Sequence, residues 1–419
     1  MIEALQGLLE IESICRYGED AYPYGEGPAK ALDYVLELCG RFGFRTKNAD
    51  YRYGYAEIGE GSELIGILAH LDTVPAGSGW KYPPFAGTLS DGRLYGRGVQ
   101  DDKGPAIASI FAMKELLDSG RPLRKRIRII FGQDEETGDW NDIKVYKGAE
   151  ELPDYGFTPD GDFPAIYAEK GIMLVELSMG LADSGFDDAA GGSAPNMVAD
   201  FCRASVGGRI FEAHGRSAHA SLPWEGDNAI TRLMCQLAEL PDAQEPPAFA
   251  AAYKALIGDS FNGAYMNCDV RDEVSGGLTM NAGTLSVEDG QIKLMLDVRY
   301  PVTFDGGELL QRMREAAEPY GMTVRSPYGM KPVYMDRNGG IIKCLLDAYR
   351  TVTGDMTEPA VSGGGTYARS MERIVAFGPG FPGKPNTEHE KNENMEVKDL
   401  LALKEIYRTA LERLLEEHI

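Results

Sequence analysis

The chain has 419 residues, of which 42 are basic and 65 acidic, and its formal net charge is −23. Hydrophobic residues make up 43% and charged residues 26%, which is ordinary globular usage and excludes a fibrous or mainly disordered chain. The surplus of negative charge repels nucleic acid and anionic membrane surfaces, so we expect neither as a partner. A chain of this length has room for two or three domains.

The first part of the chain predicts alternating helices and strands. Apolar residues at helical spacing predict helices over 28–42 and 105–117, and short apolar runs predict buried strands at 64–69 and 127–131. Strands and helices that alternate over short links are typical of an α/β fold with a doubly wound, mostly parallel sheet. In such a sheet, ligand groups collect beyond the carboxyl ends of the strands.

The pattern changes near residue 170 to strands separated by turn signals. The strands are predicted over 172–179, 196–206, 279–287 and 291–300, and two helices are predicted near 228–240 and 307–320. We therefore expect an inserted α+β domain at 170–334. The outer segments, 1–169 and 335–419, are expected to form one discontinuous domain. Its C-terminal part is predicted to contain a helix over 339–353, a strand over 374–378 and an amphipathic helix over 397–419.

The N-terminus and the cysteines indicate the compartment. The first twelve residues mix acidic and apolar side chains without a basic stretch, so we do not expect a signal peptide. No apolar run approaches the roughly 20 residues that span a bilayer. The six cysteines form no C-x-x-C pair, which favours a reducing environment. We expect a soluble cytoplasmic protein.

Several segments place metal-type ligands after a predicted strand or in a turn. His70 and Asp72 are two apart on an extended segment, so His70 could bind a metal while Asp72 accepts its other ring N–H. A single histidine after a strand is more often structural. Asp101 precedes a predicted helix; its two oxygens could bridge two ions, and a helix-capping aspartate is the simpler alternative.

Two adjacent carboxylates, Glu135 and Glu136, follow the second predicted strand. Like charges this close repel one another unless a cation or a proton compensates. Consecutive side chains point in different directions, so one could bind metal while its neighbour acts as a general base. Asp160 and His389, each alone, are typical of surface loops.

Taken together, these residues form a possible two-metal set. Two imidazoles and three carboxylates would serve two ions if Asp101 were shared, and would leave room for a water between them. The set consists of His70, Asp101, Glu136, Asp160 and His389.

The order of these motifs resembles the cocatalytic dizinc family of amidohydrolases and exopeptidases. That family includes aminoacylase, acetylornithine deacetylase, carboxypeptidase G and the bacterial dipeptidase PepV, and the resemblance covers nearly the whole chain. The matching motifs are His70-Leu71-Asp72, Gly98-Val99-Gln100-Asp101-Asp102-Lys103, Glu135-Glu136 and His389-Glu390-Lys391-Asn392-Glu393.

The resemblance implies a catalytic domain of the phosphorylase/hydrolase-like type with the insert as its lid, and two divalent ions. Zinc is the first expectation for both ions, with manganese or cobalt as alternatives. It further implies that Asp101 bridges the ions, that His70 and Asp160 bind one ion, and that Glu136 and His389 bind the other. Glu135 would be the general base, and Asp72 would orient His70.

The resemblance also assigns residues of the insert. His219 lies in a segment similar to the family's lid motif and would polarise the scissile carbonyl and stabilise its oxyanion. His214 in the same segment is expected to be structural. Asn196 and Arg299 resemble substrate contacts of the dipeptidase branch. Arg299 could pair with a substrate carboxylate through two hydrogen bonds, and a structural salt bridge is its alternative.

A Gly-Gly-Gly-Thr-Tyr-Ala-Arg run at 363–369 favours the branch that contains PepV. Dipeptidases of that branch carry a similar run, whereas deacylases usually have an acidic residue at the position of Tyr367. Gly364, Gly365 and Thr366 would contact the substrate. We therefore expect a metallopeptidase that hydrolyses small unblocked dipeptides.

Two other functions remain as alternatives. One is an N-acyl amino acid deacylase of the acetylornithine deacetylase or succinyl-diaminopimelate desuccinylase type. The other is a metal-stabilised binding protein, which would need neither Glu135 nor His219. A monomer is expected, with a dimer through the lid as the alternative.

Other motifs are disfavoured. The segment at 378–384 resembles a phosphate-binding loop, but Pro385 replaces the required Ser or Thr. The basic run at 124–128 is expected to be a solvated edge, and there is no G-x-S-x-G motif of a serine hydrolase.

Overall fold

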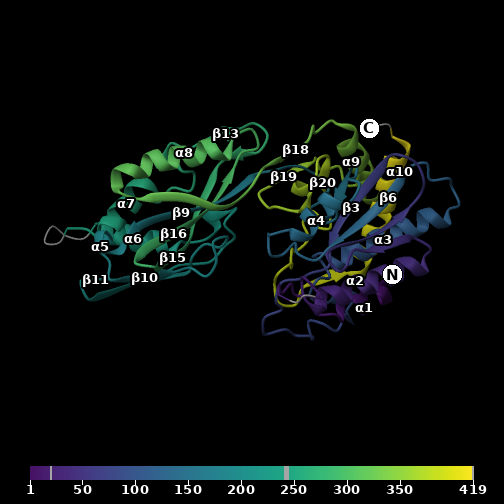
Figure 1. Ribbon diagram of the computed structural model, residues 1–419, viewed down its shortest axis with the longest axis horizontal. Helices are drawn as coiled ribbons and strands as arrows, with labels where there is room; N and C mark the ends of the chain where they lie inside the picture. The colour runs from purple at the N-terminus through teal and green to yellow at the C-terminus, as the bar shows by residue number, and fades with distance from the viewer. Residues whose placement is uncertain (19–20, 240–244, 418–419) are drawn as a thin grey trace. The chain divides into compact units, whose positions relative to one another are not determined.

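The computed structural model describes residues 1–18, 21–239 and 245–417, and it divides into two compact units (Figure 1). The first unit comprises Met1–Tyr167, Met335–Ala360 and Thr366–Ile419, and the second comprises Ala168–Tyr334 and Val361–Gly365. The segment Val361–Gly365 lies outside the expected insert, yet it clusters with the second unit. Its backbone bonds there: the Lys170 N–H donates to Ser362 O at 3.0 Å.

A large mixed sheet lies mostly in the first unit, in the order β1-β2-β6-β3-β7-β20-β8-β18, with β19 also paired to β8. The short strand β18 belongs to the residues of the second unit. The central strands β6, β3, β7 and β20 are parallel, as predicted, whereas the pairings at both edges are antiparallel. Parallel pairing requires long crossovers, so it is confined to strands joined through helices. The strands are β1 (Arg45–Asn48), β2 (Gly54–Ile58), β3 (Leu64–His70), β6 (Arg126–Gly132), β7 (Tyr155–Thr158), β8 (Ile166–Glu169), β18 (Val333–Tyr334), β19 (Ala360–Ser362) and β20 (Ile374–Ala376).

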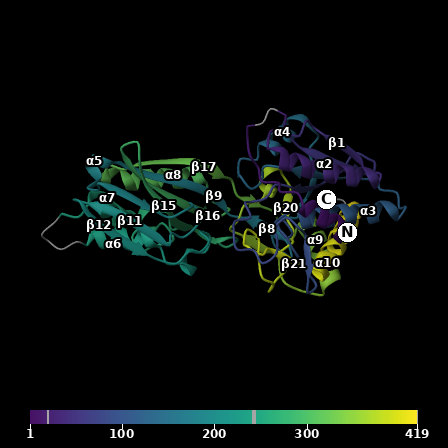
Figure 2. The same cartoon turned by 90° about the horizontal axis from the view of Figure 1, so that it is seen from below.

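Helices cover both faces of this sheet (Figure 2). Leu32 of α2 approaches Gly54 of β2, and Tyr407 of α10 stacks on Phe157 of β7, so both helices lie on the same face as Ile129 of β6. Helix α3 packs beside α10, and α4 lies on the opposite face, where its Tyr146 contacts Arg128. The helices are α1 (Ile2–Leu9), α2 (Glu26–Arg41), α3 (Lys103–Asp118), α4 (Asn141–Ala149), α9 (Gly340–Thr353), α10 (Val397–Glu416) and the 3₁₀ turn η4 (Tyr367–Ser370). A small separate sheet contains β4 (Thr88–Ser90), β5 (Arg93–Tyr95) and β21 (Asn394–Glu396).

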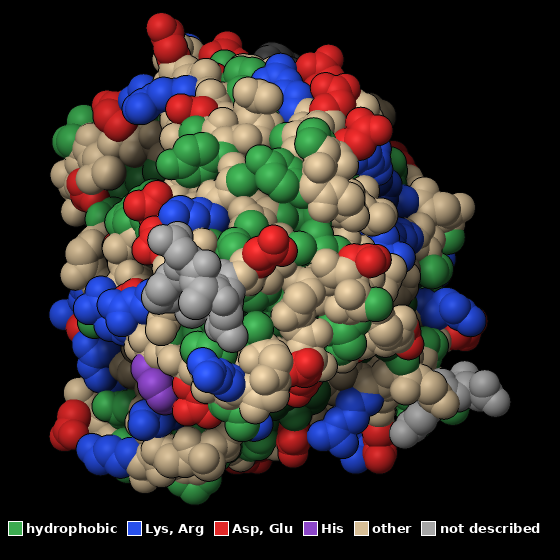
Figure 3. Space-filling view, turned by 90° about the vertical axis from the view of Figure 1, so that its left-hand side faces the viewer, with side chains coloured by type: hydrophobic (Ala, Val, Ile, Leu, Met, Phe, Trp, Pro, Cys, Tyr) green, Lys and Arg blue, Asp and Glu red, His purple; other side chains and the backbone are tan. Residues whose placement is uncertain are grey.

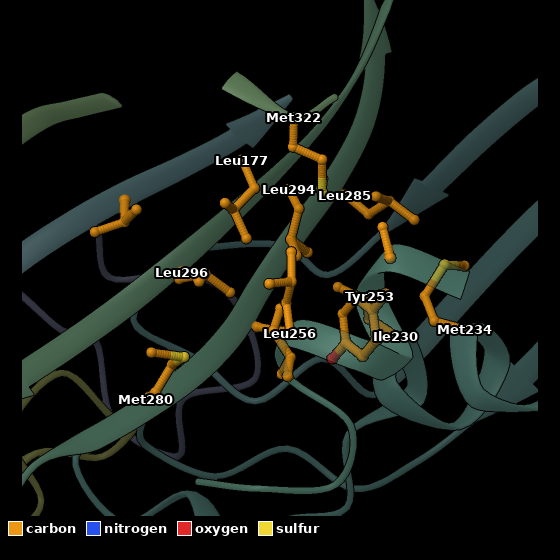
Figure 4. Close-up of a cluster of buried hydrophobic side chains, with 14 of the residues drawn as sticks. Leu177, Ile230, Met234, Tyr253, Leu256, Met280, Leu285, Leu294, Leu296 and Met322 are labelled. Carbon is orange, nitrogen blue, oxygen red and sulfur yellow. The ribbon is translucent and has the colours of Figure 1, made fainter. Parts of the chain in front are cut away.

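The second unit is an antiparallel sheet with helices packed on one face. Its strand order is β12-β11-β10-β15-β16-β9-β17. Alternate residues of β16, such as Leu294 and Leu296, point toward Ile230 of α6 and Leu256 of α7 (Figure 4). The elements are β9 (Gly171–Gly180), α5 (Leu181–Ser184), β10 (Asp188–Gly191), β11 (Phe201–Val206), β12 (Arg209–His214), η1 (Pro223–Glu225), α6 (Ala229–Ala238), α7 (Ala248–Leu256), η2 (Ala264–Met266), β13 (Arg271–Asp272), β14 (Gly276–Gly277), β15 (Thr279–Glu288), β16 (Gln291–Tyr300), α8 (Gly306–Ala317), η3 (Glu318–Tyr320) and β17 (Thr323–Met330).

Some predicted boundaries are wrong. The strand predicted over 196–206 begins only at Phe201, because a turn closed by the Met197 N–H donating to Ala194 O occupies the preceding residues. The strand predicted over 374–378 ends at Ala376, and Gly378 takes a left-handed φ of 77°. The predicted ends of two helices, at residues 240 and 418–419, lie outside the described residues.

Charged side chains of both signs are mixed on one face of the molecule (Figure 3). Figure 3 shows acidic side chains scattered among basic and hydrophobic ones on one face, in keeping with a largely solvated role for the acidic surplus. Among the described residues, no helix combines the length and the apolar character needed to cross a bilayer.

Candidate metal centre

The predicted metal ligands lie at the carboxyl ends of neighbouring parallel strands. Strand β3 ends at His70, which lies directly opposite Gly132 at the end of β6. Glu135 and Glu136 follow β6, and Asp160 follows β7. Parallel strands present their carboxyl ends at the same sheet edge, so residues far apart in sequence meet there.

The side chains form two groups that share Asp101. In one group, His70 Nε2 lies 2.8 Å from Asp101 Oδ1 and 3.9 Å from Asp160 Oδ2. In the other, His389 Nε2 lies 2.8 Å from Asp101 Oδ2 and 3.1 Å from Glu136 Oε2. Each group places at least three ligand-type atoms within 4.8 Å of one another. The structure therefore brings the predicted residues together in the predicted pairs, with one oxygen of Asp101 facing each histidine.

Asp72 contacts His70 and also holds the loop of Glu135 and Glu136. The main-chain carbonyl of Asp72 lies 3.1 Å from His70 Nδ1, and its carboxylate lies 3.5 Å from the same nitrogen. That carboxylate also accepts the backbone N–H groups of Glu135 at 3.2 Å and Glu136 at 3.0 Å. Asp72 is fully buried, so these bonds satisfy a charge that water cannot reach.

A second buried carboxylate, Glu393, organises the loop that carries Asp101. Its two oxygens accept the N–H groups of Gly98 at 3.0 Å, Gln100 at 2.8 Å and Asp101 at 3.3 Å. Arg97 pairs with Glu393 at 2.7 Å and donates a second bond to the carbonyl of His389 at 3.2 Å. The same pair thus contacts the segments of both Asp101 and His389.

The buried carboxyl groups of the centre have pKa values shifted from their ordinary range. Burial, followed by the neighbouring carboxylates, raises the pKa of Asp160 well above its ordinary value. Burial likewise raises the pKa of Glu135, with Glu136 adding to the shift and His70 opposing it. Burial opposes ionisation of Asp101, but the hydrogen bonds of His389 and His70 outweigh it and lower the pKa of that carboxyl.

The donor set fits divalent ions. Carboxylates crowded in a buried site gain from a cation, and the combination of imidazole and carboxylate donors suits zinc. One oxygen of Asp102, fully buried, also has no hydrogen-bond partner. The side chain of His389 is 52% exposed, so the centre is open to solvent at this residue.

Two predicted residues of the second unit, Asn196 and His219, lie on adjacent segments. The backbone of Met197 pairs with that of His219, and the Ala220 N–H donates to Asn196 O at 2.9 Å. His219 Nδ1 lies 2.6 Å from Ser221 Oγ. Asn281 supports the same segment, because its amide donates to Met197 O at 2.9 Å.

Arg299 forms the salt bridge that was the alternative to substrate binding. Its Nε and Nη2 donate to the two carboxylate oxygens of Asp297 at 2.5 and 2.7 Å, and its Nη1 donates to Gly363 O at 2.8 Å. The guanidinium therefore already holds the glycine segment in place. A role for Arg299 in contacting substrate stays a prediction.

The other predicted substrate contacts make local bonds. The Gly364 N–H donates to Ser362 Oγ at 2.9 Å, and Thr366 Oγ1 accepts the Ala368 N–H at 3.2 Å. Gly365 is the last residue of this stretch in the second unit, and Thr366 is the first in the next stretch of the first unit. Their substrate roles stay predictions.

Several buried residues beside the centre were not predicted from the sequence. Arg97, Trp140 and Asp142 were assigned no role, although each contacts a loop that carries a predicted ligand or base. The only sequence signal for them was their place within or just after the motifs.

The chain is similar to known proteins over nearly its whole length. A profile of peptidase family M20/M25/M40 matches residues 66–413. A protein of Staphylococcus epidermidis named "Putative dipeptidase" is 35% identical over 452 aligned positions, covering 98% of this chain and 96% of the relative.

Solved structures share the fold. A metallo-carboxypeptidase of the M20 family from Sulfolobus solfataricus matches with a TM-score of 0.66 at 18% identity, covering 99% of both chains. Human carnosine dipeptidase 1 matches with a TM-score of 0.67 at 14% identity, covering 99% of this chain and 96% of that one.

Proposed function

The chain belongs to peptidase family M20/M25/M40, and on that premise we propose that it is a dimetal dipeptidase of the PepV branch. Its substrates are small unblocked dipeptides, whose single peptide bond it hydrolyses. The relatives named as dipeptidases, aligned over 98% of this chain, support this substrate class.

The position of Asp101 carries the proposal. Its two oxygens lie 2.8 Å from two different histidines, each of which belongs to a separate ligand-type group. A carboxylate used only to cap a helix has no need of two imidazole partners, and the N-cap residue of α3 is Asp102, not Asp101. This arrangement supports two ions that share Asp101.

The donor set assigns three protein ligands to each ion. Asp101, His70 and Asp160 hold one ion, and Asp101, Glu136 and His389 hold the other. Zinc is the proposed metal at both positions, with manganese or cobalt as alternatives. When bound, a pair of such ions polarises the scissile carbonyl and acidifies the attacking water.

Glu135 performs the proton transfers. Its carboxylate accepts a proton from the attacking water and returns it to the nitrogen of the leaving amine, so that one carboxyl and one free amine result. The backbone of Glu135 is held by Asp72 on its N–H and by the Trp140 indole, which donates to its carbonyl at 3.1 Å. The side chain can therefore act from a fixed position.

The second unit supplies the substrate contacts. His219 donates a hydrogen bond to the carbonyl oxygen as negative charge develops there. Asn196, Gly364, Gly365 and Thr366 bind the dipeptide backbone. Arg299 binds the substrate carboxylate with the N–H groups that its bonds to Asp297 and Gly363 leave over.

A substrate panel tests the proposal. Free dipeptides and N-acyl amino acids are assayed with the metal-loaded protein, with and without a chelator. We expect hydrolysis of dipeptides that the chelator abolishes and that added zinc restores. Faster turnover of acetylornithine or succinyl-diaminopimelate would assign the protein to the deacylases, and turnover that survives complete metal removal would refute the dimetal mechanism.

Location and assembly are secondary proposals. We propose a cytoplasmic location, which the six free cysteines support. A monomer, with a dimer through the second unit as the alternative, stays a prediction that size-exclusion chromatography with light scattering would test.

A further inference from the structure

A buried hydrogen bond joins Tyr367 to Asp142 beside the candidate metal centre. Tyr367 opens the 3₁₀ turn η4, and Asp142 lies in the first turn of α4. Both side chains are fully buried, and the tyrosine hydroxyl donates to Asp142 Oδ2 at 2.7 Å. Neither residue belongs to the ligand groups.

Asp142 holds the start of the loop that carries Glu135 and Glu136. The oxygen that accepts the Tyr367 hydroxyl also accepts the N–H groups of Gln133 at 2.5 Å and Asp134 at 3.0 Å. Asp72 accepts the next two N–H groups along the chain. Four consecutive amides, at residues 133–136, are therefore fixed by two buried carboxylates.

The Tyr367 hydroxyl packs closely against the backbone of Gly132. A Cβ on Gly132 would lie 2.3 Å from the Tyr367 hydroxyl and 2.7 Å from Asp142 Oδ2, so only glycine allows this contact. The Tyr367 ring packs edge-on against Trp140, with ring centroids 5.4 Å apart, and the Trp140 indole in turn donates to the Glu135 carbonyl. The ring thus supports the loop from a second direction.

The turn η4 is itself anchored on α4. Lys147, in the last turn of α4, donates to Ser370 O at 2.5 Å, and the Ser370 hydroxyl donates to Tyr367 O at 2.7 Å. The turn η4 is therefore attached to α4 at two places, through the Tyr367 hydroxyl and through the carbonyl of Ser370.

We propose that Tyr367 is a positioning residue that acts through Asp142 to hold Gln133–Glu136 in the geometry needed for metal binding and proton transfer. This inference rests on the proposed function, because it assigns Glu136 to a metal and Glu135 to the proton. The hydroxyl orients the Asp142 carboxylate, and that carboxylate orients the amides. In metal sites, the groups that surround the ligands commonly set the orientation of those ligands.

The test replaces Tyr367 by phenylalanine, which keeps the ring and removes only the hydroxyl. We expect the affinity for Zn²⁺, measured by titrating the metal-free protein against a chromogenic chelator, to fall about 10-fold or more. We expect kcat for a dipeptide at saturating zinc to fall by a similar factor, with KM within about twofold, because the Tyr367 hydroxyl is not one of the proposed substrate contacts.

Tyr349→Phe is the matched control. Tyr349 is also buried in the first unit, and its hydroxyl donates to the carboxylate of Asp355 at 2.6 Å. This variant should lose a tyrosine–carboxylate hydrogen bond without a change in zinc affinity or kcat.

Two results would overturn the inference. The first is a Tyr367→Phe variant with zinc affinity and kcat within twofold of the parent, like the control, because the hydroxyl would then be structural only. The second result comes from a comparison of Tyr367→Phe, Asp142→Asn and the double variant. If the fold-loss in zinc affinity of the double variant equals the product of the two single fold-losses, Tyr367 does not act through Asp142. The zinc measurement needs no substrate, so a failure of the dipeptidase assignment would be seen separately in the parent protein.

Discussion

Replacing Glu135 by glutamine removes the proton acceptor and leaves its surroundings unchanged. The main chain of Glu135 is held by Asp72 and by the Trp140 indole, and these bonds do not involve the altered side chain. Glu135 is also absent from both ligand-type groups, so the variant should keep its metal. Glutamine has the same shape but cannot take a proton from water at neutral pH.

The variant is expected to lose kcat and to keep its stability. Removal of a general base typically costs about 100- to 10,000-fold in kcat, or roughly 2.7 to 5.4 kcal/mol of activation free energy. Stability should not suffer, because burial raises the pKa of Glu135 and so disfavours its charged form in the metal-free fold. A neutral glutamine removes that unfavourable charge.

Three measurements check this prediction together: steady-state kinetics on a dipeptide, metal content and the thermal unfolding midpoint. Glu372→Gln, at an exposed position of the same unit, controls for the loss of one negative charge. A kcat within about threefold of the parent, with metal bound, would refute the role of Glu135. Loss of metal from the variant would instead show that Glu135 is a ligand.

The remaining predictions concern the second unit, the metals and the support of Asp101. His219→Ala should lower kcat about 100-fold or more at unchanged metal content. His214→Ala, in the same segment, should behave as the parent does; a change confined to KM in the His219 variant would contradict the oxyanion role. Chelation should lower the thermal unfolding midpoint by roughly 5 to 10 °C relative to protein with metal at about 100 times its Kd, and calorimetry that finds no shift would argue against bound ions. Glu393→Gln places an amide against backbone donors, so it should weaken zinc binding about 10-fold or more in chelator competition, and an unchanged affinity would show that Glu393 does not position Asp101.

Much of the central sheet could be predicted because its signals are local. The strand β3 is buried along its whole length, and its continuous apolar run predicts such a strand. His70 and Glu135 follow predicted strands of a parallel sheet, so their place at one sheet edge could be predicted. The strand before Asp160, β7, was not predicted. The antiparallel edges of the sheet could not be predicted in this way, because strand order depends on contacts between distant segments.

The sequence by itself determined which residue types are present for metal chemistry, because each motif is short and lies next to a recognisable strand or turn. Only the tertiary structure decided how those residues are held. It gave the carboxylate of Asp72 to the backbone of Glu135 and Glu136, and it paired Arg299 with Asp297. It also brought Tyr367 to Asp142 across 225 positions of the chain. Hydrogen-bond partners in a buried site depend on which segments pack together, and no local pattern contains that information.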